Sequence, residues 1–264
     1  MVYAHILMYL VCPDMSERRA GEKTVGVIGG MGPEATVDFL RRLVAATPAR
    51  DDRDHLHVLV DNNPKVPSRI AALIEGTGED PAPVLCAMAK GLQAQGADFL
   101  VIPCNTAHYY LPTIARSIQI PLLNMVELSI RKLAAAGARR VGLLASPAVR
   151  LVGLYKVQME QAEMQALFPD PCHEEMLLDV IKAVKAGQSG GRRRQDYAKV
   201  AGHLLDAGAD ALLVACTELS ILKLPKKNAN LMVDTLDVLV EATIAAATPA
   251  SHGVCGNGIH LKTG

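Results

Sequence analysis

Two cysteines, Cys104 and Cys216, stand at matching places in the chain, each after a short apolar run and before small polar residues. The apolar runs, Asp98 to Ile102 and Asp210 to Val214, have the composition of buried strands. A thiol at the end of a strand lies beside backbone N–H groups of the next turn or helix, whose dipoles favour a thiolate and also bind a carboxylate. When two sulfurs flank one substrate carbon, one thiolate can remove a proton while the other thiol returns a proton to the opposite face. The pair therefore suggests inversion of a stereocentre.

Each cysteine also has a structural alternative, because a single cysteine in an apolar strand is usually a small buried hydrophobe. The repeated position favours a functional interpretation, since Asn105 and Thr106 follow the first cysteine and Thr217 follows the second. The remaining cysteines lack this context, and we interpret them as structural or incidental. They are Cys12, Cys86, Cys172 and Cys255.

Two similar units position the cysteine pair. In the first, Thr24 to Ile28 predicts a strand that leads into a glycine-rich turn, and Pro33 is well placed in the first turn of the following helix. In the second, Arg140 to Leu144 predicts the corresponding strand. The sequences QAQGAD and LDAGAD, each with a glycine that ends a helix, precede the two cysteine-bearing strands. The interval from the first strand to the cysteine is nearly equal in the two units, which indicates an internal duplication.

Alternating strands and helices predict an α/β fold with two similar domains, whose mostly parallel sheets are related by a pseudo-twofold. Further strands are expected at His55 to Val60, Ile120 to Met125 and Leu231 to Val233. Ligands of such sheets bind outside the carboxyl ends of the strands, where both cysteines fall. We therefore expect the active site in the cleft between the domains.

The expected domain boundaries follow from the duplication. Residues 23–122 together with residues 234–249 form the first α/β domain, and residues 123–233 form the second, so that the final helix packs back onto the first unit. Residues 1–22 and 250–264 are interpreted as terminal extensions. The first dozen residues are apolar, but they are too few to span a membrane and lack a basic leading segment.

The composition restricts the function further. The 264 residues include 27 basic and 27 acidic side chains, and this balance argues against a nucleic-acid or membrane-surface partner. Aromatic residues make up 3% and tryptophan is absent, so the chain has few side chains on which nucleic-acid bases could stack. Six cysteines without a C-x-x-C pair favour free thiols in a reducing, cytoplasmic compartment. The expected ligand is therefore small and polar.

Five segments resemble a known family. They closely resemble the aspartate/glutamate racemase superfamily, and specifically its aspartate racemase branch. The resemblance covers residues 23–247, and PCNTAH paired with CTEL at this separation is highly specific. It implies a cofactor-independent amino-acid racemase with two α/β domains, an active site between them and a homodimeric assembly. The segments are GVIGGMGPEAT (26–36), NNPKVPSR (62–69), PCNTAH (103–108), VKAG (184–187) and ACTELS (215–220).

The resemblance implies roles for the residues at the two strand ends. It makes Cys104 and Cys216 the two acid/base thiols, acting on opposite faces of the substrate α-carbon. Asn105, Thr106 and Thr217 then hold the substrate α-carboxylate through side chains and backbone N–H groups. Both thiols and the three polar residues that follow them are thus expected at one ligand.

Four further positions are assigned by the same resemblance. Met31 lies in the glycine turn and faces the pocket, Arg69 binds a substrate carboxylate, and Lys185 approaches from the other domain. Glu218 stands where glutamate racemases tend to carry histidine, which fits the aspartate branch. A bidentate Arg69 would give a dicarboxylate both affinity and orientation, although either cation alone is equally compatible with a solvated side chain. His108, four residues beyond the first thiol, either tunes that thiol or is a satisfied structural histidine, which we favour.

One loop departs from the pattern of the family. After the strand at 140–144 the family commonly reads A-T-x-G-T, whereas this chain has Ala145, Ser146, Pro147, Ala148 and Val149. Ser146 keeps a hydroxyl, but Ala148 replaces the glycine and Val149 replaces the later threonine. A loop that often helps to bind substrate has lost a donor and gained bulk, which leaves substrate and turnover open.

Dinucleotide binding is the main rival for the glycine turn. The run from Gly30 to Ala35 fits G-x-G-x-x-A after a strand. However, Asp61, the acidic residue that closes the next strand, lies beyond the interval of roughly 20 residues that this pattern requires. Pro33 also removes an N–H from the helix start where a pyrophosphate docks.

Metal and pyridoxal chemistry are disfavoured as well. No sequence feature identifies a Schiff-base lysine with its phosphate-binding turn. The arginines at 192–194 are most simply a charged helix start. One acidic and histidine-rich stretch is better explained by the rim of a strand than by a metal site. It contains Asp51, Asp52, Asp54, His55 and His57.

We therefore predict interconversion of L- and D-aspartate by two-base proton transfer, without cofactor or metal, with glutamate as the next substrate. A homodimer is expected, with no nucleic-acid or membrane partner. One alternative is another racemase, isomerase or decarboxylase on the same scaffold, although relatives that protonate from one side need only a single cysteine. Another is a non-catalytic binder of acidic amino acids, which the altered 145–149 loop favours.

Overall fold

The computed structural model describes residues 21–222 and 231–248. The terminal extensions interpreted above, residues 1–22 and 250–264, lie outside the described residues except for Gly21 and Glu22. Residue 249, expected at the end of the first domain, also lies outside them. Among the described helices, none has the length and apolar character needed to cross a membrane.

Two parallel sheets organise the chain. The strands in chain order are β1 (Val25–Gly29), β2 (Val58–Asn62), β3 (Phe99–Val101), β4 (Arg140–Ala145), β5 (Gln165–Leu167), β6 (Ala211–Ala215) and β7 (Met232–Asp234). The first sheet has the order β2-β1-β3, the second has the order β5-β4-β6-β7, and every pairing is parallel. The predicted α/β class with two parallel sheets is confirmed.

The two sheets correspond strand for strand. Each central strand pairs with the strand that leads to one cysteine, so that Gly26 lies opposite Leu100 and Gly142 lies opposite Leu212. Both glycines sit under close neighbours. A Cβ on Gly26 would lie 2.4 Å from Leu100 Cδ2, and one on Gly142 would lie 2.7 Å from Leu212 Cδ2. The duplication inferred from the sequence therefore extends to register and packing.

The second strand begins later than predicted. β2 starts at Val58 rather than at His55. The preceding residues form a 3-10 turn, η1 (Asp52–Asp54), whose hydrogen bonding extends to the N–H of His55. A capping box at Asp51 satisfies the start of this turn, so the acidic stretch is explained by local structure.

The strand expected over Ile120 to Met125 is reduced to an isolated bridge between Leu122 and Leu100. Pro121 has no N–H to donate to a ladder, and the side chain of Asn124 already caps the following helix. Too few residues remain between them for a longer strand.

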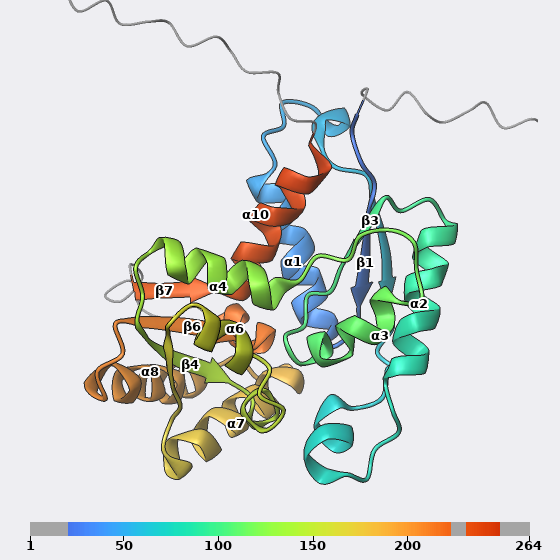
Figure 1. The fold of residues 1–264 in the computed structure, drawn as a ribbon. Coiled ribbons are helices and arrows are strands. Elements are labelled where there is room, and N and C mark those ends of the chain that lie inside the picture. Colours follow the sequence, from blue (N-terminus) through green and yellow to red (C-terminus); the bar gives the residue numbers. More distant parts are fainter. Residues whose placement is uncertain (1–20, 223–230, 249–264) are drawn as a thin grey trace, which may run out of the picture.

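Helices flank the strands along the whole described chain, as Figure 1 shows. The first half contributes helices after each strand, and the second half repeats this arrangement. They are α1 (Pro33–Ala46), α2 (Ala82–Ala94), α3 (Leu111–Ala115), α4 (Met125–Ala135), α5 (Pro147–Leu151), α6 (Lys156–Gln161), α7 (Pro171–Lys185), α8 (Gly191–Asp206), α9 (Thr217–Leu222) and α10 (Thr235–Ala247), with the short π-helical turn η2 (Ala71–Glu75) and 3-10 turn η3 (Thr106–Tyr110).

Both faces of each sheet are buried. In the first sheet, Ile28 and Leu100 pack toward α2, whereas Val25 and Val27 pack on the opposite face toward α1 and α10. In the second sheet, one face packs toward α4 and α6 and the other toward α7 and α8. Such burial on both faces explains why the strands are continuous apolar runs.

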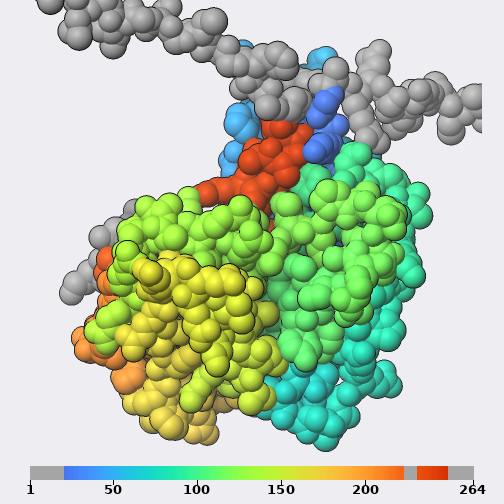
Figure 2. Space-filling view, in the orientation of Figure 1, coloured from blue at the N-terminus to red at the C-terminus, as the bar shows by residue number. Residues whose placement is uncertain are grey.

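Two helices cross between the halves. α4 leaves the first half, and its Val126, Ile130 and Leu133 pack on the second sheet. α10 leaves the second half, and its Leu236 and Leu239 pack on the first sheet. Figure 1 shows α10 beside α1, and Figure 2 shows the two halves packed directly against each other. The final helix thus returns to the first sheet, while the domain limits at 122 and 234 stay a prediction.

Candidate functional site

A cavity of about 620 Å³ lies at the carboxyl ends of the strands and is lined by both halves. This is the position that the parallel-sheet argument predicts for a ligand. The structure brings all of the predicted site residues to its wall. They are Met31, Arg69, Cys104, Asn105, Thr106, Lys185, Cys216, Thr217 and Glu218.

The glycine turn after β1 forms one wall. Gly30 has φ +93°, and a Cβ there would lie 2.3 Å from the backbone of Asn63, so only glycine fits. Its N–H donates to Thr36 Oγ1 at 2.9 Å, which ties the turn to the first turn of α1. The same hydroxyl donates to Gly32 O at 3.2 Å, so the residues on both sides of Met31 are bound to α1.

Arg69 is held in place by backbone carbonyls. Its Nη1 donates to Pro67 O at 3.0 Å and its Nη2 donates to Met31 O at 3.0 Å. Its Nε is buried and has no hydrogen-bond partner among the described residues. In residues 21–222 and 231–248, no carboxylate forms an ion pair with Arg69, so this cation is available to an anionic ligand.

The Cys104 turn is anchored by His108. Its Nδ1–H donates to Cys104 O at 2.9 Å, and its Nε2 accepts from the N–H of Met125 at 3.1 Å. Burial lowers the pKa of His108 to about 4, although its hydrogen bond to the Cys104 carbonyl partly offsets this effect. The ring is therefore neutral near pH 7, and the interpretation of His108 as a satisfied structural histidine is confirmed.

Asn105, in the first half of the molecule, is bound by two residues of the second half. Its Oδ1 accepts from the Tyr155 hydroxyl at 2.5 Å, and its Nδ2 donates to Thr235 Oγ1 at 2.9 Å. Burial raises the pKa of Tyr155, which therefore keeps its proton as a donor. The sequence did not indicate either partner, because both lie far along the chain from Asn105.

The second thiol has a charged neighbourhood. Cys216 Sγ donates to Glu218 Oε2 at 3.1 Å, and the other carboxylate oxygen of Glu218 binds Lys185 Nζ. Burial and the adjacent Glu218 carboxylate raise the pKa of Cys216 well above its ordinary value, against the opposing influence of Lys185. The backbone N–H of Glu218 lowers the pKa of Cys216, as expected at a strand end, but burial and the Glu218 carboxylate outweigh this effect.

Lys185 reaches the pocket from the end of α7. Burial disfavours its charge, but Glu218 and then Cys216 outweigh this effect, and the pKa of Lys185 is raised. The ammonium thus neutralises Glu218 beside the thiol. The pairing explains how a glutamate that is only 5% exposed remains in the wall.

Two buried hydroxyls at the wall have no hydrogen-bond partner among the residues that the structure describes. They are Ser146 Oγ and Thr217 Oγ1. Buried polar atoms are rarely unsatisfied, so both are candidate ligand contacts. Ser146 follows β4 as Gly30 follows β1. The sequence predicted that Ser146 keeps a hydroxyl but did not assign Ser146 to the site. Its position after β4, equivalent to the glycine turn after β1, was the signal that could have identified it.

The altered loop does not reshape this cavity through its later residues. Ala148 and Val149 are buried in the second half, where Val149 belongs to the core packed against β4 and α4. Neither residue lines the cavity. The replacement of threonine by Val149 therefore does not remove a donor from this wall.

One possible metal-ligand group lies elsewhere. Within the part of the chain that the structure describes, only Asp170, His173 and His203 bring three such atoms together. His173 Nδ1 already bonds Asp170 at 2.8 Å, and the two imidazoles stack at 4.0 Å with planes 9° apart. Nearly parallel rings do not converge on one ion. This group does not line the cavity.

Comparison with known proteins gives the family. Residues 28–243 match the family described as Asp/Glu/Hydantoin racemase. The chain is similar in structure to the Picrophilus torridus aspartate racemase, with 32% identity, a TM-score of 0.76 and coverage of 85% of this chain and 94% of that one. It is 23% identical over 228 residues to the broad specificity amino-acid racemase RacX of Bacillus subtilis (strain 168), covering 84% of this chain and 96% of the relative.

A more distant structure shares the fold alone. It is the glutamate racemase of Francisella tularensis, at 16% identity and a TM-score of 0.58, with 85% of this chain and 81% of that chain covered. The sequence match and the structural similarity agree, and they extend over most of the described chain. The chain belongs to the Asp/Glu/hydantoin racemase family and is an amino-acid racemase, hence an isomerase, of that family.

Proposed function

We propose that the protein interconverts L- and D-aspartate by two-base proton transfer, with Cys104 and Cys216 as the acid and base. The observation that carries this proposal is the placement of the two thiols, one from each half, at the wall of one cavity. In the described part of the chain, neither thiol forms a disulfide. A racemase must exchange a proton on both faces of the α-carbon, and thiols from opposite halves meet that need.

The substrate is held by its two carboxylates. The α-carboxylate lies against the turns that follow the thiols, where it accepts from Thr217 Oγ1 and from backbone N–H groups at Asn105 and Thr106. The unsatisfied Thr217 hydroxyl supports this arrangement. The side-chain carboxylate binds Arg69, because among the described residues that cation has no carboxylate partner and its Nε has no hydrogen-bond acceptor.

Racemisation needs two proton transfers, one on each face of the α-carbon. A Cys104 thiolate takes the α-proton of one enantiomer, forming an S–H bond while the C–H electron pair stays on the substrate. The Cys216 thiol then gives its proton to the opposite face, leaving a thiolate. The raised pKa of Cys216 suits it to be the proton donor in the resting state. In the reverse direction, the Lys185 ammonium stabilises the Cys216 thiolate.

A broader substrate range is the second candidate. Arg69 fixes a distal carboxylate, but a cavity of about 620 Å³ is roomy for aspartate alone. The similarity to a broad-specificity racemase favours this alternative. The resemblance to the aspartate racemase branch also supports a homodimer, and the free thiols suit the reducing environment of the cytoplasm.

Chiral analysis in deuterated water tests the proposal. The purified, reduced protein is incubated with L-aspartate, D-aspartate or L-glutamate, and enantiomers and α-deuterium are measured together. Formation of the opposite hand with deuterium at the α-carbon supports racemisation and identifies the substrate. Binding of aspartate without exchange, in a folded and reduced sample, would overturn the proposal in favour of a non-catalytic binder.

A further inference from the structure

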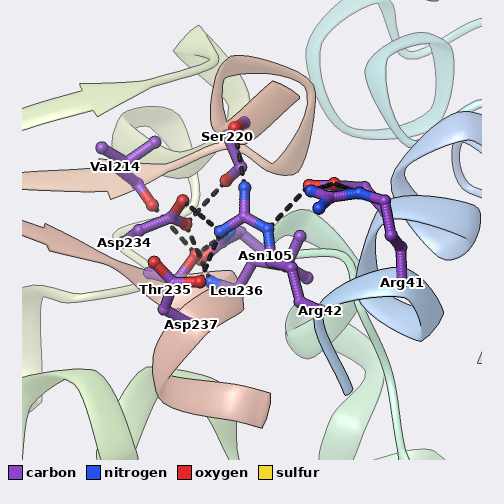
Figure 3. Close-up of polar contacts among 10 residues, drawn as sticks. Arg41, Arg42, Asn105, Val214, Ser220, Asp234, Thr235, Leu236 and Asp237 are labelled. Atoms are coloured by element: carbon purple, nitrogen blue, oxygen red, sulfur yellow. Dashed lines mark hydrogen bonds and ion pairs between the residues drawn. The ribbon is translucent and has the colours of Figure 1, made fainter. Parts of the chain in front are cut away.

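A set of buried polar contacts meets where β7 passes into α10. Asp234 caps the helix and Thr235 is its first residue. Thr235 is fully buried, and its hydroxyl donates to Val214 O at 2.9 Å. The same oxygen accepts from Asn105 Nδ2 at 2.9 Å. Figure 3 shows these groups converging on the start of α10.

The two partners of Thr235 belong to the two thiol-bearing turns. Asn105 directly follows Cys104, whereas Val214 lies in β6 just before Cys216. One hydroxyl therefore links the first-half turn to the second-half strand. Both partners are buried, so their hydrogen bonds are not readily exchanged for water.

Asp234 strengthens the same junction from the other side. Its Oδ1 accepts from Ser220 Oγ at 2.7 Å, and Ser220 belongs to α9, which starts directly after Cys216. Its Oδ2 accepts from Arg42 Nη1 at 2.8 Å. Arg42 also donates to Ser220 O at 2.7 Å, as Figure 3 shows. The start of α10 is thus fixed to α9 and to α1, whose first turn lines the cavity.

The duplication provides an internal comparison. Leu122 pairs with β3 as Met232 pairs with β6, so Met125 in the first half stands where Thr235 stands in the second. Met125 is fully buried and begins α4 without any side-chain hydroxyl. The first half therefore makes this strand-to-helix junction without a hydroxyl at the equivalent position, so the junction itself does not require the hydroxyl of Thr235.

We propose that Thr235 is a positioning residue that sets the relative position of the Cys104 and Cys216 thiols. The inference rests on the proposed function, in which both thiols act on one α-carbon. Its hydroxyl joins the two turns directly, through one atom and two hydrogen bonds. Asp234 holds the backbone from which that hydroxyl projects.

Substitution of Thr235 tests this role. Thr235→Val keeps the side-chain shape but can neither donate to Val214 nor accept from Asn105. We expect kcat for racemisation to fall about tenfold or more, with KM changed less than about twofold, because small displacements of reacting groups cost up to about 10²-fold. Thr235→Ser keeps the hydroxyl and is expected to restore kcat. Thr235→Ala replaces the valine variant if that variant does not fold.

Thr243→Val is the matched control. Thr243 is also fully buried in α10, but its hydroxyl donates to Leu239 O in the same helix at 2.6 Å. This variant is expected to lose a buried hydroxyl while keeping the kcat of the wild type. Melting temperatures of all variants separate a general loss of stability from a loss of positioning.

A second readout does not depend on turnover. The reduced proteins are treated with dichloroacetone, a short reagent that alkylates two thiols, and the peptide cross-linked between Cys104 and Cys216 is quantified by mass spectrometry. We expect a lower yield in Thr235→Val than in wild type, Thr235→Ser and Thr243→Val. Unchanged kcat or unchanged cross-linking in Thr235→Val overturns the proposal. If the wild type racemises no amino acid, the proposed function fails, and the cross-linking yields alone decide whether Thr235 positions the thiols.

Discussion

The two cysteine-bearing turns occupy equivalent places in the fold and are secured by different chemistry. Four residues after each cysteine, a buried polar side chain binds the start of a crossing helix. In the first half, His108 accepts from the N–H of Met125 at the start of α4. In the second half, Ser220 donates to Asp234, which caps α10. Both halves therefore link the cysteine-bearing turn to the start of a crossing helix, but they do so with different side chains.

The charges of the two turns differ more than their packing. Cys216 donates to Glu218, and Glu218 in turn binds Lys185. Within the described chain no carboxylate accepts a hydrogen bond from Cys104. Duplication thus preserved the scaffold and let the electrostatics diverge. In the proposed reaction such asymmetry is useful, because one thiol must hold a proton while the other accepts one.

Removal of either thiol should give the largest effect. Cys104→Ala and Cys216→Ala are each expected to lower racemisation about 10²–10⁴-fold, the usual contribution of a positioned acid or base. Each variant keeps one base, so each should still exchange the α-proton of one enantiomer, and the two variants should favour opposite hands. Deuterium incorporation into both enantiomers, followed by mass spectrometry, measures this. Near-normal racemisation in either variant would contradict the two-base mechanism.

His108 should make the first turn sensitive to acid, whereas Ser220 at the equivalent place does not titrate. The pKa of folded His108 is lowered from 6.5 to about 4 by burial, so between these values the unfolded chain binds the extra proton. Stability is therefore lost as the pH falls from about 6.5 to about 4, by about 3 kcal/mol for this group. Urea unfolding across this range measures the slope.

Two variants isolate that contribution. His108→Gln is expected to flatten the dependence of unfolding free energy on pH, whatever its stability near pH 7. Ser129→Ala is the control, since it removes a buried hydrogen bond in α4, from Ser129 Oγ to Met125 O at 2.7 Å, without removing a titratable group. An unchanged acid slope in His108→Gln would mean that other groups cause it.

The cations of the two halves should also differ in their effect on substrate. Within residues 21–222 and 231–248, Arg69 has no carboxylate partner, whereas Lys185 is paired with Glu218. Arg69→Met is expected to raise KM for aspartate about 10- to 100-fold, the value of one or two charge-assisted hydrogen bonds. Arg69→Lys keeps the charge but loses the planar guanidinium, so its KM for aspartate should lie between those of the wild type and Arg69→Met. Arg131→Met, which changes an exposed side chain on α4, is the control. Steady-state kinetics decides, and an unchanged KM in Arg69→Met would remove Arg69 from the site.

Each sheet has a closely packed glycine in its central strand, and substitution of these two glycines tests whether the packing is equally tight. A Cβ on Gly26 would meet Leu100 Cδ2 at 2.4 Å, and one on Gly142 would meet Leu212 Cδ2 at 2.7 Å. Each alanine variant is expected to lose about 1–3 kcal/mol of unfolding free energy through overpacking, with Gly26→Ala the larger loss. Gly91→Ala is the control, because its Cβ would meet nothing within 4 Å. Denaturant unfolding measures the order, and equal stability of all three would contradict the packing argument.

Much of the fold was predictable because the duplicated strands are continuous apolar runs with glycine stop signals. β1, β4 and β6 lie within one residue of their predicted limits. The errors arose where local chemistry competes with strand formation. The capped turn before β2 delayed that strand, and Pro121 together with Asn124 left only a bridge at Leu122.

The sequence predicted which residues line the candidate site, but it did not predict the contacts between them. The motifs placed Cys104 and Cys216 at one cavity, as the lining residues show. They did not reveal that Glu218 and burial raise the pKa of Cys216, or that Thr235 links the two turns. Such contacts join residues that are distant in sequence or depend on how deeply a group is buried, and neither property is written in a local pattern.

The pH dependence of thiol alkylation tests whether the charged neighbours of Cys216 act on that thiol alone or also on Cys104. Glu218 helps to raise the pKa of Cys216, while Lys185 opposes it. Glu218→Gln is therefore expected to move iodoacetamide alkylation of Cys216 to lower pH, and Lys185→Met to higher pH. Peptide mass spectrometry follows Cys216 and Cys104 in the same digest. In Glu218→Gln, a shift confined to Cys216 would mean that Glu218 acts on its own turn. Equal shifts of both thiols would mean that one field spans the cavity, and no shift would remove Glu218 as a determinant of the proton on Cys216.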